Sequence, residues 1–243
     1  MIDLSKTYLL TFEIGSECNL TKQHSKCPIN KRKYKCTSYG SLRVDDIIRL
    51  IDEAMDLGFH GYIAFHYYNE PLLYRDKIEK VMDKRPDCKY LLWTNGLLFS
   101  RNIQDNEIIQ RMSQVVITCY DKANMPFFMG LKKHYNNIEI QEWELDERLV
   151  IYEETYKNEL GCKKVQFEFP IDFYGNVHLC CYDWNNEYEL GNVFKNGLTE
   201  IVESSRYQNL LSQCKNRLLD YKVCPDICTR CRYPWIWKVL EVE

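Results

Sequence analysis

The chain has 243 residues, of which 45% are hydrophobic and 28% are charged, and its formal net charge at pH 7 is −3. This composition is typical of a soluble globular protein, and the small net charge gives no reason to expect nucleic-acid or membrane binding. No apolar stretch approaches the roughly 18 residues of a membrane-spanning helix, and residues 1–6 lack the basic and apolar regions of a signal peptide. We therefore expect a cytoplasmic protein without a membrane partner.

Short apolar strands alternate with amphipathic helices in the first part of the chain. The expected strands cover residues 7–14, 61–66, 90–94, 115–118 and 138–145, and the expected helices cover residues 44–57, 76–84 and 105–112. Strands that alternate with helices of this length predict a parallel sheet with helices packed on it. Because these units are too few for a closed eight-stranded barrel, we expect an α/β fold with a partial (β/α) barrel over residues 1–150.

The pattern changes near residue 150. Two apolar stretches, residues 165–169 and 177–179, flank Tyr174-Gly175-Asn176, whose residue types favour a turn. They predict a β-hairpin, and a helix is expected at residues 198–207. We therefore expect a second, small domain over residues 151–243, in which a hairpin and a helix precede a cysteine-rich tail.

Twelve cysteines need an explanation in a protein expected in a reducing compartment, where disulfides are rarely stable. Metal or cluster binding is the leading interpretation. In Cys228-Thr229-Arg230-Cys231, the spacing lets two thiolates reach one metal centre from a single turn. Two more thiolates on the hairpin would complete a four-sulfur site for zinc or for an iron–sulfur cluster, and spacing alone does not choose between them.

The hairpin and the tail also carry a family pattern. Cys162 is followed by twelve residues, Gly175, four residues and Cys180, and then by Cys181-Tyr182-Asp183-Trp184 and Leu190-Gly191-Asn192-Val193. This pattern resembles the SPASM/twitch extension of radical SAM enzymes, and the short tail suits a twitch with one auxiliary cluster. The resemblance implies an auxiliary [4Fe-4S] cluster whose ligands are Cys162, Cys180, Cys228 and Cys231, with Cys224 or Cys181 as alternatives.

The loop after the first expected strand holds a second family pattern. Cys18-Asn19 and Cys27-Pro28 resemble the two ends of the cluster loop of radical SAM enzymes, which reads C-N-x-x-C-x-x-C-P, although the loop is longer here. In that family, three protein ligands leave one iron of a [4Fe-4S] cluster free to bind S-adenosylmethionine (SAM). The resemblance implies either Cys18, Cys27 and Cys36 as these ligands or a set in which His24 takes the middle position, and a site without a working cluster is a third possibility. We favour the three cysteines, because thiolates are the usual ligands of such clusters.

Two strand ends resemble the SAM-binding segments of the same family. Tyr68-Asn69-Glu70-Pro71 follows the second expected strand and resembles the G-G-E-P segment, with Tyr68 and Asn69 in place of glycines. Thr94-Asn95-Gly96 follows the third and resembles the T-N-G segment, although a simple turn would explain it nearly as well. The resemblance implies a SAM site formed by Tyr68, Asn69, Glu70, Pro71, Thr94 and Asn95.

The leading hypothesis that follows from the resemblance is a radical SAM enzyme of the oxidoreductase or maturase type. Such an enzyme reductively cleaves SAM to a 5′-deoxyadenosyl radical, which abstracts a hydrogen atom from a substrate. The resemblance suggests a peptide, a sugar or another small natural product as substrate, and an auxiliary cluster that transfers electrons or binds substrate. No catalytic side chain can be named from the sequence.

The loop around the first cysteines is basic and suggests partners. Its cationic residues are Lys22, Lys26, Lys31, Arg32, Lys33 and Lys35. They form either a solvated surface or an attraction for an anionic substrate or an electron donor such as flavodoxin or ferredoxin. The alternative hypothesis is a non-catalytic, cysteine-rich zinc or iron–sulfur module that engages a partner or RNA through this loop. Such a module would not need the two SAM-like segments.

Overall fold

The computed structural model describes residues 4–25, 27–30, 40–145, 162, 164–215, 225–229 and 231. Within these residues, one eight-stranded sheet has the strand order β5-β4-β3-β2-β1-β6-β7-β8. The strands are β1 (Leu9–Phe12), β2 (Tyr62–Ala64), β3 (Lys89–Thr94), β4 (Gln114–Cys119), β5 (Ile138–Glu142), β6 (Glu168–Ile171), β7 (Asn176–Val177) and β8 (Gly191–Asn192).

Strands β1 to β6 run parallel to one another. β1 pairs with β2 on one side, where Leu10 is opposite Ile63, and with β6 on the other, where Leu10 is opposite Phe169. The pairs β2–β3, β3–β4 and β4–β5 are parallel as well. The carboxyl ends of these strands therefore lie along one edge of the sheet, where α/β folds place their functional sites. The parallel sheet and its helices confirm the predicted α/β partial barrel.

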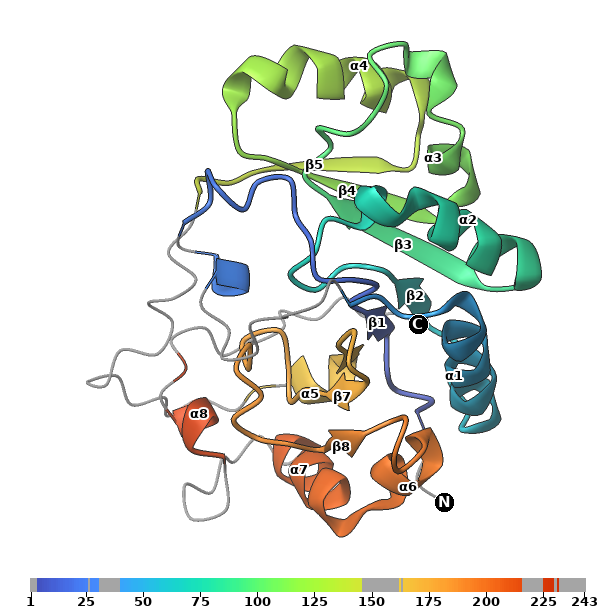
Figure 1. Cartoon of the computed structure of the whole chain (residues 1–243), viewed down its shortest axis with the longest axis vertical. Coiled ribbons are helices and arrows are strands. Elements are labelled where there is room, and N and C mark those ends of the chain that lie inside the picture. The colour runs from blue at the N-terminus through green and yellow to red at the C-terminus, as the bar shows by residue number, and fades with distance from the viewer. Residues whose placement is uncertain are drawn as a thin grey trace.

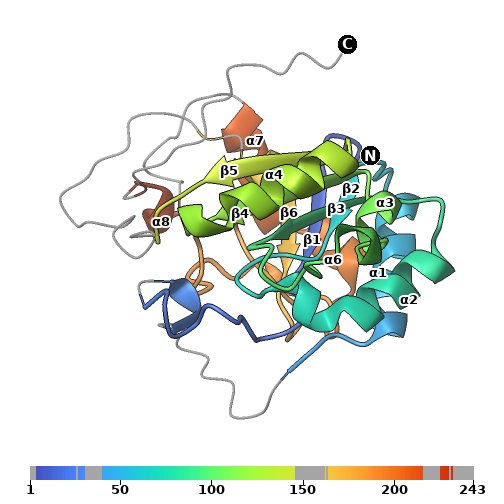
Figure 2. The ribbon, with the colours of Figure 1, turned by 90° about the horizontal axis from the view of Figure 1, so that it is seen from above.

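The helices that follow the strands cover one side of the sheet. The described helices are α1 (Val44–Asp56), α2 (Arg75–Lys84), α3 (Ile108–Arg111), α4 (Met125–His134), α5 (Lys164–Phe167), α6 (Leu198–Glu203), α7 (Ser205–Lys215) and α8 (Asp226–Thr229), and the short 3-10 turns are η1 (Pro28–Asn30), η2 (Pro71–Tyr74), η3 (Ile103–Asp105) and η4 (Lys122–Asn124). Helices α1 and α2 lie on one side of the strands, whereas the N-terminal loop, drawn in blue, and α8 lie on the other (Figure 1). The view from above shows the same separation (Figure 2).

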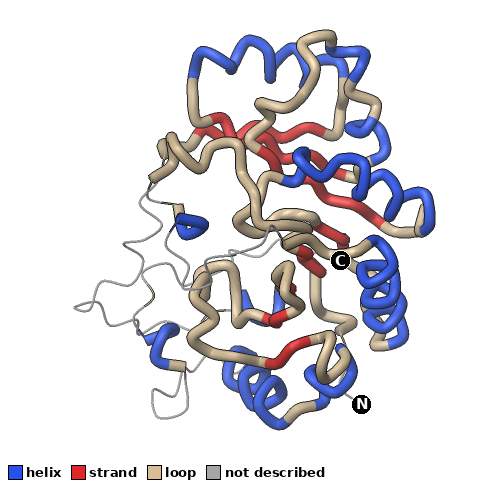
Figure 3. Tube along the Cα trace, viewed as in Figure 1, coloured by secondary structure: helices blue, strands red, loops and turns tan. Residues whose placement is uncertain are grey.

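The core lies between the sheet and this helical layer, where helices shown in blue flank the red strands (Figure 3). Helix α1 buries Ile47, Leu50, Ile51 and Ala54, which recur at the three- and four-residue spacing of one helix face. Full burial of an isoleucine or leucine side chain contributes about 1.5–3 kcal/mol. On the opposite side of the sheet, Leu9, Ala64 and Leu91 form a second, smaller cluster. Apolar residues on both faces are typical of parallel strands.

Two helices differ in extent from the sequence-based expectation. The expected helix at residues 198–207 is two helices, because the Ser204 side chain ends α6 by donating to the Ile201 carbonyl at 2.7 Å and begins α7 by accepting from the Tyr207 N–H at 3.2 Å. The expected helix at residues 105–112 is split into η3 and α3, and the buried Asn106 between them donates to the Ser100 carbonyl at 3.0 Å.

Two other segments were wrongly assigned or missed in the sequence. Residues 165–167, expected to start a strand, are helical and belong to α5. Helix α4 was not expected, because its sequence buries only Phe128 and Leu131 and therefore carries little helical periodicity; a proline near its start fits the first turn of a helix.

The predicted hairpin is present and continues the main sheet. β6 pairs antiparallel with β7, with Ile171 opposite Val177, and β7 pairs antiparallel with β8. The turn uses Gly175 at φ 83°, a backbone conformation that favours glycine. The boundary predicted near residue 150 falls outside the described residues, so the division into two domains stays a prediction. None of the helices in the described residues combines the length and hydropathy that a membrane span requires.

Candidate functional site

The N-terminal cysteine loop, residues 15–25 and 27–30, follows β1 at the carboxyl edge of the sheet. The Asn30 side chain closes the loop by donating to the His24 carbonyl at 2.9 Å, and the Cys27 N–H donates to the same carbonyl at 3.0 Å. Cys18 and Cys27, two of the predicted cluster ligands, and the alternative ligand His24 therefore share one compact loop. The third predicted ligand, Cys36, lies outside the described residues.

The Glu70 carboxylate joins the two SAM-like segments. It accepts hydrogen bonds from the Thr94 hydroxyl at 2.6 Å, the Asn95 N–H at 2.9 Å and the Leu72 N–H at 3.1 Å. Burial raises the pKa of Glu70, which is 2% exposed, and these three hydrogen bonds oppose that rise by stabilising the charged form. Because the protein itself occupies both carboxylate oxygens, the side chain holds the loop after β2 against the loop after β3.

Two further hydrogen bonds attach these segments to the N-terminal cysteine loop. The Glu70 N–H donates to the Glu17 carbonyl at 2.8 Å, and the Asn95 side-chain amide donates to the Asn19 side chain at 2.7 Å. Glu17 and Asn19 flank Cys18 in the sequence. The three patterns identified in the sequence therefore meet at the ends of β1, β2 and β3.

A second group of thiols gathers on the loop after β7. Burial raises the pKa of Cys180 well above its usual value, and the nearby thiols of Cys181, Cys162 and Cys231 raise it further. Three of the four predicted auxiliary ligands are thus within electrostatic reach of one another. The fourth, Cys228, lies in α8, and its carbonyl accepts the Cys231 N–H at 3.4 Å.

A buried ion pair lies beside these thiols. The Lys164 ammonium is 3.0 Å from the Glu168 carboxylate, and their side chains are only 14% and 2% exposed. Desolvation lowers the pKa of Lys164, but the charges of Cys181 and Glu168 outweigh it and raise the pKa overall. A cation at this position stabilises nearby thiolates.

Of the two alternative ligands of the auxiliary cluster, Cys181 is adjacent to Cys180, and Cys224 lies outside the described residues.

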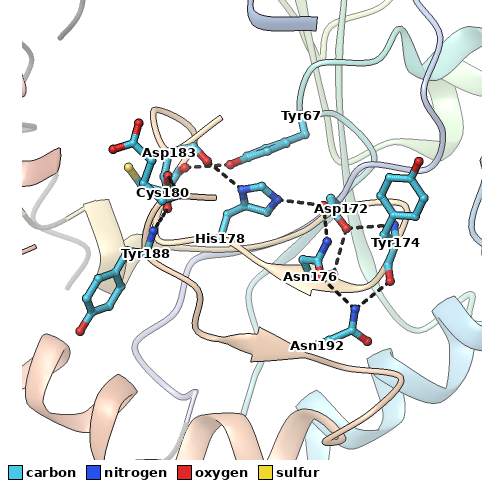
Figure 4. Close-up of polar contacts among 10 residues, drawn as sticks. Tyr67, Asp172, Tyr174, Asn176, His178, Cys180, Asp183, Tyr188 and Asn192 are labelled. Carbon is cyan, nitrogen blue, oxygen red and sulfur yellow. Dashed lines mark hydrogen bonds and ion pairs between the residues drawn. The ribbon is translucent and has the colours of Figure 1, made fainter. Parts of the chain in front are cut away.

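His178 holds the cysteine loop to the hairpin (Figure 4). Its Nε2 is 3.0 Å from the Asp172 carboxylate, and its Nδ1 is 2.8 Å from the Asp183 carbonyl. Burial would raise the pKa of Asp172, but the hydrogen bond and the charge of His178 outweigh it and lower the pKa. The imidazole therefore lies between a carboxylate oxygen of the hairpin and a backbone carbonyl of the cysteine loop, both of which are hydrogen-bond acceptors.

Replacing His178 with alanine is expected to lower the free energy of unfolding by about 1–3 kcal/mol, because the buried Asp172 carboxylate and Asp183 carbonyl each lose a hydrogen bond. Asp172 keeps the hydrogen bonds that it accepts from Tyr174 and Asn176. Chemical denaturation of the metal-free chain at pH 7 measures this loss. The control is Arg75→Ala, which breaks the partly exposed Arg75–Glu79 pair and is expected to cost less than about 0.5 kcal/mol. Equal losses for the two variants would contradict a stabilising role of the buried His178 hydrogen bonds.

A family comparison identifies the part of the chain that contains this cysteine group. Residues 162–232 match the SPASM family, an iron–sulfur cluster-binding domain. We call these residues the SPASM domain, after the family that they match. The match begins at Cys162 and extends beyond Cys231, as the spacing of the cysteines predicted.

Comparisons over nearly the whole chain agree with this domain assignment. The chain is 20% identical to the S-adenosyl-L-methionine-dependent 2-deoxy-scyllo-inosamine dehydrogenase of Niallia circulans, over 92% of each sequence. The crystal structure of BtrN in complex with AdoMet and 2-DOIA has a TM-score of 0.70, 18% identity and 93% coverage of both chains. Native anSMEcpe with bound AdoMet and Cp18Cys peptide has a TM-score of 0.57 and 13% identity, with coverage of 93% of this chain and 89% of that one. These findings confirm the predicted resemblance to radical SAM enzymes with a SPASM or twitch extension.

The residues of the SPASM domain fit an iron–sulfur cluster in their chemistry. Several thiols lie together in a partly buried region next to the Lys164 cation, and thiolates are the usual ligands of such clusters. In the part of the chain that the structure describes, no three His, Cys, Asp or Glu side chains are close enough together to hold a single metal ion. A four-iron cluster is bound through separate irons, so its ligands are more widely spaced than those of one ion.

Two contacts between the SPASM domain and the loop after β2 were not predicted from the sequence. The Tyr67 hydroxyl donates to the Cys180 carbonyl at 2.8 Å, and the Tyr68 hydroxyl donates to the Cys181 carbonyl. Figure 4 shows Tyr67 reaching across to the loop that carries Cys180. Burial raises the pKa of Tyr67 well above its usual value, so the hydroxyl keeps its proton. The sequence did contain a signal for these contacts. Tyr68 stands where the family pattern has a glycine, and Tyr67 precedes it.

Proposed function

We propose that the protein is a radical SAM enzyme that reductively cleaves SAM and removes a hydrogen atom from a substrate. The observation that carries the proposal is the meeting of three segments at the carboxyl edge of the sheet. The Cys18 loop, the segment Tyr68–Pro71 and the segment Thr94–Gly96 are joined there by hydrogen bonds of 2.6–2.9 Å. When bound, a reduced [4Fe-4S] cluster and SAM supply a 5′-deoxyadenosyl radical at such a site.

Each group of residues has a distinct part in this proposal. Cys18, Cys27 and Cys36 would hold the SAM-binding cluster, with His24 as the alternative ligand, and Cys162, Cys180, Cys228 and Cys231 would hold the auxiliary cluster, with Cys181 or Cys224 as alternatives. Tyr68, Asn69, Glu70, Pro71, Thr94 and Asn95 would frame SAM. Glu70 acts as a positioning residue, because its carboxylate fixes the backbone of Asn95.

A hydroxyl-bearing small molecule is the first candidate substrate, and oxidation is the first candidate outcome. The support is the similarity over 92% of each chain to a protein named as a 2-deoxy-scyllo-inosamine dehydrogenase. A peptide is the second candidate, because the anSMEcpe structure with a TM-score of 0.57 contains one. Oxidation of an alcohol removes two electrons, and the contacts of Tyr67 and Tyr68 with the SPASM domain support a role of that domain in receiving the second electron or holding the substrate.

The basic residues of the N-terminal cysteine loop support an acidic electron donor such as flavodoxin or ferredoxin. Lys22 is exposed in the described part of this loop. Opposite surface charge accelerates the encounter of two proteins, and the acceleration falls with ionic strength.

The test of the proposed function is anaerobic reconstitution with iron and sulfide, followed by dithionite and SAM. We expect about eight irons per chain, as two four-iron clusters, and formation of 5′-deoxyadenosine. The matched variant Cys18→Ala should keep about four irons and form no 5′-deoxyadenosine. A wild-type chain that holds both clusters and binds SAM, yet forms none, contradicts the proposal. Binding of about one or two zinc ions in place of iron would favour the cysteine-rich binding module.

A further inference from the structure

Four consecutive residues, Tyr67–Glu70, connect the two cysteine-containing loops of the molecule. At one end, the hydroxyls of Tyr67 and Tyr68 donate to the carbonyls of Cys180 and Cys181 in the SPASM domain. At the other end, the Glu70 N–H donates to the carbonyl that precedes Cys18, at 2.8 Å. Only Asn69 lies between the two ends, so a displacement at one cysteine loop is transmitted through a single short segment.

The connecting segment is braced along its length. The Asn69 side chain accepts from the Tyr67 N–H at 3.1 Å and donates to the Phe65 carbonyl at 3.2 Å, which closes the backbone into a tight loop. Tyr67, Tyr68 and Asn69 are 7%, 4% and 8% exposed. The two tyrosine rings pack edge to face, with centroids 4.4 Å apart. Buried and mutually packed side chains of this kind transmit a displacement instead of absorbing it.

The SPASM loop that receives these hydrogen bonds is braced as well. The His178 ring donates to the Asp183 carbonyl at 2.8 Å, and its centroid is 5.1 Å from that of the Tyr67 ring. The backbone around Cys180 is thus held by His178 of the hairpin and by Tyr67 (Figure 4), and the Tyr68 hydroxyl adds its hydrogen bond to the Cys181 carbonyl. A glycine at position 68, as in the family pattern, could not make the contact with the Cys181 carbonyl.

We infer that Tyr67 and Tyr68 couple SAM binding to the auxiliary cluster, so that occupancy of one site changes the affinity or electronic state of the other. The inference rests on the proposed function, since it requires SAM at the first loop and a cluster at the second. Tyr67 and Tyr68 are positioning residues in this account, because they act through the Cys180 and Cys181 carbonyls. Coupling between two binding events is reciprocal, so it can be measured from either site.

A double-mutant cycle tests the coupling through SAM affinity. SAM dissociation constants are measured by equilibrium dialysis without reductant in four anaerobically reconstituted chains: wild type, Cys180→Ala, Tyr67→Phe/Tyr68→Phe, and the combined variant. Loss of the auxiliary cluster should weaken SAM binding about fivefold or more when the tyrosines are present, the range of typical coupling. With the phenylalanines, the same loss should change the constant by less than about twofold. Equal factors in the two backgrounds, or no change in the tyrosine background, would overturn the inference.

A second measurement keeps both clusters in place. S-adenosylhomocysteine, a thioether that cannot form the radical, should shift the electron paramagnetic resonance signal of the reduced auxiliary cluster in the wild type. At least half of that shift should disappear in Tyr67→Phe/Tyr68→Phe. Tyr135→Phe is the matched control, because this buried hydroxyl donates to the Ile103 carbonyl at the same 2.8 Å, away from both cysteine loops. An undiminished shift in the double variant, or an equal loss in Tyr135→Phe, would overturn the inference.

The two hypotheses fail in different ways. If 5′-deoxyadenosine forms but neither measurement detects coupling, the inference falls and the proposed function stands. If a chain with both clusters binds no SAM, both fall.

Discussion

Replacing Cys180 with alanine is expected to remove about half of the bound iron, from about eight to about four irons per chain. The reason is the position of Cys180, which lies close enough to the thiols of Cys162 and Cys231 to interact with them electrostatically. All three are predicted ligands of the auxiliary cluster. A four-iron cluster that loses one of four thiolates is not retained when no other ligand can reach the vacant iron. Iron and sulfide analysis after anaerobic reconstitution measures the loss, and SAM binding should remain detectable.

Two controls decide whether Cys180 or its neighbour is the ligand. Cys181→Ala should retain about eight irons, although it removes a thiol next in sequence. Cys119→Ala removes a buried thiol from β4, which lies in another part of the fold, and should also retain them. If Cys181→Ala loses the cluster and Cys180→Ala keeps it, the ligand is Cys181 and the alternative assignment holds.

Replacing Cys36 with alanine is expected to abolish the SAM-cleaving cluster and the formation of 5′-deoxyadenosine. Three protein ligands are needed so that one iron stays open for SAM, and Cys36 is the remaining thiol of the loop that holds Cys18 and Cys27. The longer spacing is no obstacle, because each doubling of loop length adds only about 0.6 kcal/mol to the cost of loop closure. Iron content should fall to about four per chain, and product formation should fall below detection.

The matched variant for this prediction is His24→Ala, which should largely retain both the cluster and the activity. Thiolates bind iron–sulfur clusters more readily than imidazole does. In the structure the His24 side chain is buried, with its ring centroid 5.4 Å from that of Tyr120, and the Cys27 N–H donates to its carbonyl. If His24→Ala loses the cluster while Cys36→Ala retains it, the ligands are Cys18, His24 and Cys27.

Much of the fold could be predicted from local patterns in the sequence. The strands β1 to β5 each overlap a stretch expected to be a strand, because buried parallel strands consist of short apolar runs bounded by turn residues. β3 begins one residue before its expected stretch, and β4 extends one residue beyond each end of its own. The hairpin around Gly175 was also predicted from a local pattern, because its turn requires a residue that accepts a positive φ. Helix α4 was not predicted, because a short helix with two buried residues has little hydrophobic periodicity. The division at Ser204 was not predicted either, because the sequence around a single serine does not show that one helix ends there and another begins.

The sequence by itself determined the residue types at the candidate site and their order along the chain. The cysteine spacings, Asn69-Glu70-Pro71 and Thr94-Asn95-Gly96 were recognisable as patterns, because each lies within a few consecutive residues. That was enough to predict a SPASM-type extension, which the match to residues 162–232 confirms. It was also enough to predict the SAM-binding residues and cluster ligands, which stay predictions.

Only the tertiary structure decided which of these residues touch. β6 lies beside β1, which brings Thr11 within 3.0 Å of the Glu168 carboxylate although more than 150 residues separate them. Tyr67 reaches the Cys180 carbonyl, and the Glu70 carboxylate joins the ends of β2 and β3. Local sequence pattern reports whether a residue prefers burial or a turn, but the partner of a buried polar group depends on which strands become neighbours. That choice is made by the packing of the whole sheet, because buried hydrogen-bonding groups must be paired wherever the fold places them.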